Sequence, residues 1–267
     1  MGVTRWAFTQ PPATPRQAAV TLVVFGALTH DEPMSMSKFG APPGTAPSDL
    51  RRFARADDPA WFDGWRSGSL GAIARIDLDG DTAALERADV LHVITAEVVG
   101  STDLAYLQTA WAIARYLVAR GATTVLDAHA MMFHAGAALP PPGPLDVAYE
   151  VRVIYETEST RPDQAHAIHT RGLRKFGVPD LVALCSDGDV ALISSAIGEL
   201  ADAMARGQEL GTPRHRVEVM PGVTWVVVPD EHRLADLLQL NNTARVLVDS
   251  DGHDLVGVAE RLRRRPS

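Results

Sequence analysis

Two stretches of this sequence place an apolar helix pattern between two apolar runs, and this order limits the folds open to the chain. The first has apolar runs at 90–95 and 123–126, with apolar residues at helical spacing from Leu104 to Val118. The second has runs at 180–185 and 216–219, with a helical stripe from Val190 to Met204. Spacings of three and four residues predict a helix that buries one face, and short apolar runs between turn residues predict strands. Further strands are predicted at 20–25, 149–155, 224–228 and 245–248.

This order favours an α+β fold, in which a mixed or mainly antiparallel sheet carries two long amphipathic helices. The likeness of the two stretches leaves open two similar halves that arose from an internal repeat. A continuous parallel sheet is the alternative, because strand–helix–strand crossovers produce the same order. The proline-rich run 139–144 predicts a stiff linker between a first half, 1–138, and a second half, 145–267. We expect the halves to pack together as one compact unit.

The segment 31–69 interrupts the pattern, because it contains five prolines. We expect a long loop with a short helix near 50–56, and loops of this length often serve as lids or binding loops. Trp61, Phe62 and Trp65 lie near its end. They form either a small core that fixes the loop to the body or an exposed recognition patch. Trp61 and Trp65 are therefore candidate binding residues.

Composition narrows the classes of partner. The net charge of −8 repels a phosphate backbone, so we expect no nucleic-acid partner. The single cysteine, Cys185, excludes an internal disulfide and fits a reducing, cytoplasmic location. It lies in an apolar run, which predicts a buried side chain. No apolar run is long enough to cross a bilayer, so we expect no membrane partner.

Polar side chains are densest between residues 164 and 180. His169 and Arg171 are the catalytic candidates in this stretch, and Thr170, Arg174 and Lys175 are candidate binding residues. His166 and His169 would share a face on a helix but point to opposite faces on a strand.

A second group of candidate catalytic residues follows the run 123–126. If the strand continues, Asp127 and His129 share a face, and with His134 and the histidines of the 164–180 stretch they have the residue types of a metal site. No complete metal motif such as H-E-x-x-H or C-x-x-C is present, so we expect no metal and no cofactor. The run 249–252, Asp-Ser-Asp-Gly, predicts a turn.

A purely structural interpretation of the 164–180 stretch stands beside the chemical one. Gly172 and Gly177 allow backbone angles that other residues avoid, and Pro179 favours an extended residue before it. Thr170 and Asp180 have side chains that bond readily to nearby backbone groups. By this interpretation the stretch is a corner that places the strand at 180–185.

The string from His169 to Leu181, His-Thr-Arg-Gly-Leu-Arg-Lys-Phe-Gly-Val-Pro-Asp-Leu, resembles a motif of uncharacterised bacterial proteins. That domain-of-unknown-function family has the pattern His-Thr-x-Gly-Leu-x-x-Phe-Gly-x-Pro-Asp/Glu-Leu. The run from Ala112 to Asp127 is also similar to the family, and together the similarity covers about half of the chain. The resemblance implies a shared fold and no established activity, and some such bacterial families act in toxin–immunity systems.

These observations favour a non-enzymatic binding or interaction protein of the bacterial cytoplasm with a protein partner, and the resemblance adds the immunity type as one such function. Two alternatives stay open. The first is a hydrolase-like or metal-dependent enzyme that uses His169 and Arg171 with Asp127 and His129. The second is a small-molecule sensor with its pocket under the 31–69 segment. The oligomeric state is not predicted.

Overall fold

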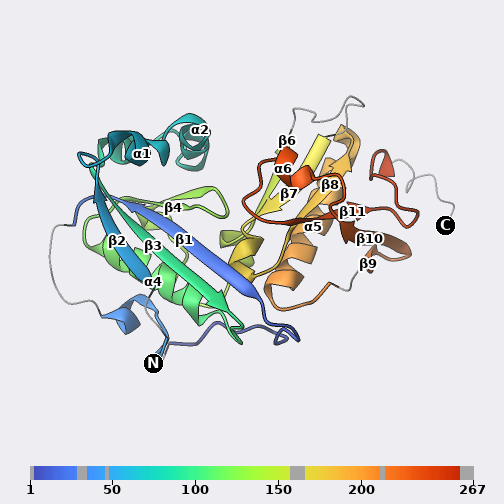
Figure 1. Ribbon diagram of the computed structural model, residues 1–267, viewed down its shortest axis with the longest axis horizontal. Coiled ribbons are helices and arrows are strands. Elements are labelled where there is room, and N and C mark those ends of the chain that lie inside the picture. Colours follow the sequence, from blue (N-terminus) through green and yellow to red (C-terminus); the bar gives the residue numbers. More distant parts are fainter. Residues whose placement is uncertain (1–2, 29–34, 46–47, 157–165, 211–213, 259–267) are drawn as a thin grey trace. The chain divides into compact units, whose positions relative to one another are not determined.

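The computed structural model describes residues 3–28, 35–45, 48–156, 166–210 and 214–258 (Figure 1). The chain divides into two compact units, Met1–Tyr149 and Glu150–Ser267, and each is built on its own sheet. The predicted α+β fold with mixed or antiparallel sheets is confirmed, although the strands are shared between two sheets instead of one. The proline-rich run 139–144 is bonded into the first unit. There, Trp6 Nε1 donates to the carbonyl of Gly143 (2.7 Å) and Arg115 Nη1 to that of Pro140 (2.8 Å).

The first unit contains a five-stranded antiparallel sheet in the order β2-β3-β1-β4-β5. Strand β1 lies between β3 and β4, so the strands on either side of the predicted helix are parallel but not adjacent. The strands are β1 (Gln17–Phe25), β2 (Asp49–Ala54), β3 (Val90–Val99), β4 (Thr124–Asp127) and β5 (Met132–Ala135).

One face of this sheet carries helix α4 (Ala105–Ala119). The Trp111 ring on α4 packs edge-on against His134 of β5, with ring centroids 5.4 Å apart. The helix is buried well beyond the predicted apolar stripe, because the N-terminal segment also bonds to it. The buried side chain of Gln108 accepts the backbone N–H of Trp6 (2.9 Å) and donates to the carbonyl of Thr4 (2.9 Å).

The other face is covered at one end by three short helices, α1 (Pro59–Gly64), α2 (Gly68–Asp77) and α3 (Ala83–Arg87), two of which are labelled in Figure 1. Their apolar residues form a core with Phe25, Leu91 and Phe133, and the fully buried Phe62 lies within it. The prediction of a long loop at 31–69 is therefore wrong for much of that segment. Its residues 49–54 form strand β2 instead of the expected helix, because they pair with β3 from Asp49↔Thr95 to Ala54↔Val90.

The second unit contains a six-stranded mixed sheet in the order β6-β7-β8-β11-β10-β9. Strands β8 and β11 are parallel, and the other neighbours are antiparallel. The strand order differs from that of the first unit, since two strands separate β8 from β9. The strands are β6 (Arg152–Glu156), β7 (His166–Arg171), β8 (Asp180–Cys185), β9 (His215–Met220), β10 (Val223–Pro229) and β11 (Ala244–Val248).

Two helices complete the second unit. Helix α5 (Val190–Ala205) buries Ile193, Ile197, Leu200 and Met204, which confirms most of its predicted stripe. The short helix α6 (Leu234–Leu237) packs through Leu234 on a second apolar cluster, which includes residues of β7, β8, β10 and β11. Among the described residues, no helix is both long enough and apolar enough to cross a membrane.

Candidate functional site

The stretch from His169 to Leu181 forms a corner between β7 and β8, as the structural interpretation predicted. The hydroxyl of Thr170 donates to Asp180 Oδ1 (2.9 Å) and accepts the backbone N–H of Leu181 (2.9 Å). Asn242 Nδ2 donates to Asp180 Oδ2 (2.9 Å). Gly172 and Gly177 have φ angles of 112° and 67°, which lie in the left-handed region that favours glycine. The polar groups of this corner are therefore engaged in holding the backbone.

The cationic candidates in the same stretch also bond within the second unit. Arg171 donates to the carbonyls of Leu238 (2.9 Å) and Gln239 (3.2 Å), at the end of α6. Arg174 donates to the carbonyl of Asn241 (2.7 Å). The Lys175 ammonium lies 2.5 Å from Glu150 Oε2, and both side chains are almost completely buried. None of these three residues lines any of three clefts, of about 560, 440 and 630 Å³, that the described residues form.

His169 lies in the interior of the second unit and is fully buried. Its ring nitrogens face Glu156 Oε1 at 3.2 Å and the carbonyl of Thr170 at 3.3 Å. Burial lowers the pKa of His169, and the contact with Glu156 offsets this only in part. His166 lies three positions earlier on strand β7 and points to the opposite face, so the two histidines do not form a pair of metal ligands.

Asp180 is the most perturbed carboxyl of the corner. Burial raises its pKa to about 6. Hydrogen bonds from Asn242, Thr170 and the backbone of Leu173 favour the ionised carboxylate, so they lower the pKa and oppose part of this rise. A carboxyl with a raised folded-state pKa holds its proton more tightly in the native protein than in the unfolded chain. The corner is therefore most stable when this carboxyl is protonated.

This shift predicts a pH dependence of stability. From about pH 4 to pH 6 the native state binds more protons than the unfolded state, so the free energy of unfolding should fall by about 3 kcal/mol from this group as pH rises. In Asp180→Asn, which cannot ionise, that part of the fall should be absent. Urea unfolding of both proteins at pH 4.5, 5.5 and 7 measures it. An identical pH dependence in the two proteins would contradict the prediction.

Asp127 and His129 belong to the first unit, and His169 and Arg171 belong to the second. Strand β4 ends at Asp127 and the chain turns there into β5, so the condition under which Asp127 and His129 would share a strand face is not met. Asp127 Oδ1 accepts the backbone N–H groups of His129 (3.0 Å) and Ala130 (3.1 Å), so the carboxylate stabilises the turn.

The aromatic residues of the 31–69 segment divide between the two interpretations. Phe62 is completely buried, and Trp65 packs partly buried against the same core, so the cluster fixes the segment to the body. Trp61 is 40% exposed and contacts Phe53 and Trp65, with ring centroids 4.7 and 5.9 Å away. Of the two tryptophans predicted to bind a partner, Trp61 is therefore the one that a partner can reach.

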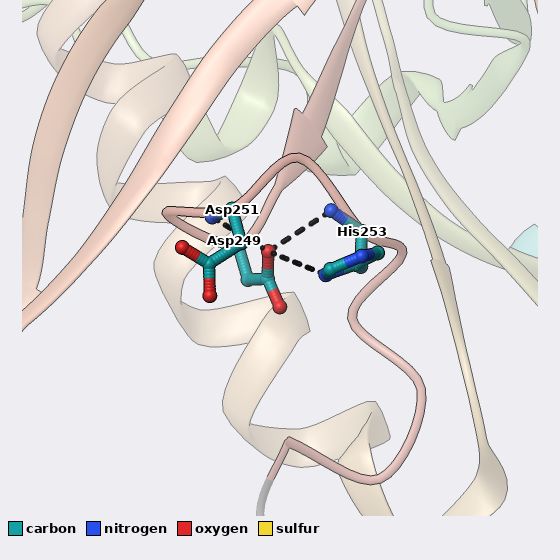
Figure 2. Close-up of side chains that lie close together, drawn as sticks. All are labelled: Asp249, Asp251 and His253. Atoms are coloured by element: carbon teal, nitrogen blue, oxygen red, sulfur yellow. Dashed lines mark hydrogen bonds and ion pairs between the residues drawn. The ribbon is translucent and has the colours of Figure 1, made fainter.

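Asp249, Asp251 and His253 cluster in the turn after β11, and each has a possible ligand atom within 4.8 Å of those of the other two (Figure 2). Asp249 Oδ1 accepts the backbone N–H groups of Asp251 and His253, both at 2.9 Å, and faces His253 Nδ1 at 3.6 Å. The ring of His253 is mostly exposed. This is a hydrogen-bonded turn closed by an aspartate, as predicted for this run. The hydrogen bonds within the turn account for the clustering without a metal ion.

A polar cleft of about 560 Å³ lies in the first unit, and we name it the first-unit cleft. Its lining combines the N-terminal segment, part of the 31–69 segment, strand β3 and the start of α4. The lining residues are Arg5, Gly44, Thr45, Ser48, Asp49, Thr95, Ala96, Glu97, Val98, Ser101, Asp103, Ala105 and Tyr106. Its size is in the usual range for a small-molecule site.

One atom of this lining stands out. The hydroxyl oxygen of Ser48 is buried and has no hydrogen-bond partner among the described residues. Buried polar groups in native proteins are nearly always hydrogen-bonded, and each exception calls for an explanation. This unpartnered hydroxyl belongs to a residue that lines the first-unit cleft, and it marks the cleft as the candidate site.

The sequence prediction missed the polar residues of this cleft. Strand β3 was expected to end at residue 95, but it continues to Val99. The alternation of Thr95 and Glu97 with Ala96 and Val98 has the period of a strand and would have extended it. Arg5, Ser48 and Asp103 are far apart in the sequence, and no local pattern joins them.

In comparisons with known proteins, no family model, curated protein or solved structure matches this chain. The resemblance of the His169–Leu181 motif to a bacterial family of unknown function therefore stays a prediction.

Proposed function

We propose that this chain is a non-enzymatic binding protein that holds a small polar ligand in the first-unit cleft. The observation that carries the proposal is at Ser48, a residue of the cleft lining whose hydroxyl oxygen is buried and lacks a hydrogen-bond partner among the described residues. The cleft also adjoins the 31–69 segment, under which a sensor pocket was one of the expected alternatives. A ligand there would bridge this segment and strand β3.

The enzymatic alternative lacks comparable support. His169, Thr170, Arg171 and Lys175 all make hydrogen bonds within the second unit, which gives each a structural role. A general base or nucleophile must reach a substrate in a cleft. We therefore place the binding function in the first unit, in a protein of the bacterial cytoplasm. The single cysteine, which is buried, supports a reducing compartment.

A protein partner, of the immunity type or another, is the second candidate function. The exposed Trp61 favours it, because tryptophan is enriched among the residues that contribute most to protein interfaces. Strand β2 is at the edge of the first sheet, and its Phe53 ring contacts the ring of Trp61. A partner that binds here should lose affinity by about tenfold or more in Trp61→Ala, and should be unaffected by changes in the first-unit cleft.

The Ser48→Ala variant tests the proposed function. Removing the Ser48 hydroxyl breaks no hydrogen bond to a described residue. The free energy of unfolding of the ligand-free protein should therefore change by less than about 0.5 kcal/mol. Ligand affinity should fall by about three- to tenfold, because one hydrogen bond contributes about 1 kcal/mol. Screening a metabolite library by thermal shift identifies ligands, and titration calorimetry compares the two proteins.

A matched control is Thr82→Ala, which removes a hydroxyl that donates to Glu86 on the surface of the first unit. It should leave every ligand affinity unchanged. If no library compound stabilises the protein, or if ligands bind Ser48→Ala as tightly as the parent, the proposed site is wrong.

A further inference from the structure

We infer that the ligand of the first-unit cleft is a small organic cation with amine or guanidinium groups, bound through Glu97. This inference rests on the proposed function and adds the chemical class of the ligand. Two features of the cleft support it, namely its balance of charge and its balance of hydrogen-bond donors and acceptors.

One carboxylate in the lining of the first-unit cleft has no cationic partner among the described residues. Asp103 Oδ2 is 2.7 Å from Arg5 Nη1, and Asp49 Oδ2 is 2.7 Å from Arg51 Nε, so these two carboxylates are neutralised within the protein. The exposed Glu97 forms no ion pair with a described residue. The lining of the cleft therefore has a net negative charge, which attracts a cation and repels an anion.

The hydrogen-bond balance favours the same class. The hydroxyl of Ser101 already donates to the carbonyl of Asp103 (2.7 Å), and that of Thr45 donates to the carbonyl of Pro42 (3.2 Å). Their protons are engaged, and each oxygen still has a lone pair that can accept, although Ser101 Oγ also accepts the backbone N–H of Asp103 (3.4 Å). The guanidinium of Arg5 is engaged by Asp103 and by the carbonyl of Pro43 (2.8 Å).

Beside the remaining N–H groups of the partly exposed Arg5, the cleft offers a ligand acceptors: the carboxylate of Glu97 and the lone pairs of the engaged hydroxyls. Ammonium and guanidinium groups carry only donors and a positive charge, so they complement such a lining. Ser48 can accept from the ligand and donate back to it where the ligand has an oxygen.

Three flexible probes of similar length test the class of ligand. Spermidine is cationic, 1,8-octanediol is neutral and suberate is anionic, and agmatine adds a guanidinium. By titration calorimetry at 0.15 M salt, spermidine or agmatine should bind, and octanediol and suberate should bind at least tenfold more weakly. Glu97→Gln should weaken binding of the cation by about tenfold, the loss of one charge-assisted hydrogen bond.

The control Asp81→Asn removes one exposed carboxylate from the same unit, outside the first-unit cleft. It should leave the affinity unchanged. Equal weakening by Asp81→Asn and Glu97→Gln would show a diffuse attraction and overturn the role of Glu97. If neither cation binds, the inference is wrong. If suberate or octanediol binds more tightly and Ser48→Ala weakens it, the cation class is wrong while the proposed function stands.

Discussion

Replacing Lys175 by methionine should lower the free energy of unfolding of the second unit by about 3–5 kcal/mol. Lys175 and Glu150 are 0% and 1% exposed at their side chains, with Nζ and Oε2 2.5 Å apart. The methionine keeps much of the volume but removes the ammonium beside a buried carboxylate. An ionised carboxylate that loses its buried partner keeps the full cost of its desolvation. Urea unfolding, monitored through hydrogen exchange of the β8 amides, measures the loss of stability within this unit.

Two variants make the cause of this loss identifiable. Lys175→Met/Glu150→Leu removes both charges and should recover most of the lost stability, because a buried ion pair and an apolar pair of similar volume are often nearly equal in stability. Arg206→Ala breaks an exposed pair with Asp202 in the same unit and should cost less than about 1 kcal/mol. If the double variant is as unstable as Lys175→Met, lost packing explains the effect and the charge argument is wrong.

Replacing Phe62 by alanine should destabilise the first unit by about 3–5 kcal/mol. The ring is completely buried, and its centroid lies 6.4 Å from that of Phe25 in an edge-on arrangement. Its removal leaves a cavity between α1 and the sheet, at the place where the 31–69 segment is fixed to the body. Urea unfolding followed by tryptophan fluorescence measures the loss, since four of the five tryptophans lie in this unit.

The neighbouring Trp61 provides the control for this experiment. It is 40% exposed, so Trp61→Ala should cost about 1 kcal/mol or less although it deletes a larger side chain. The two variants separate the structural role of the aromatic cluster from a role in binding a partner. Equal destabilisation by both would mean that Trp61 belongs to the core and is unsuited to recognition.

Local pattern was sufficient for the elements that bury their residues in a regular way. Strand β8 is apolar at nearly every position and is buried throughout, and helix α5 buries the stripe that its spacing predicted. The corner between β7 and β8 was also accessible, because Gly172 and Gly177 indicate special backbone angles wherever they occur. Burial of Cys185 followed from its apolar neighbours.

Pairing between distant segments was not accessible in this way. Strand β2 has mostly exposed side chains, including Arg51 and Arg52, and exists because its backbone pairs with β3. Strand β1 separates β3 from β4, and β11 and β10 separate β8 from β9. Which strands pair with each other is not encoded in the local spacing of apolar residues, because several strands have similar patterns.

The sequence by itself therefore determined the class of the fold, the major strands and helices, and the corner that follows His169. Only the tertiary structure decided which polar groups are engaged inside the protein and which are open to a ligand. Lys175 was a candidate binding residue until Glu150 was found beside it, and Ser48 became one only when its hydroxyl proved to lack a partner within the part of the chain that the structure describes. The physical reason is that hydrogen bonds and ion pairs depend on distances of a few ångströms between segments that are far apart in the chain.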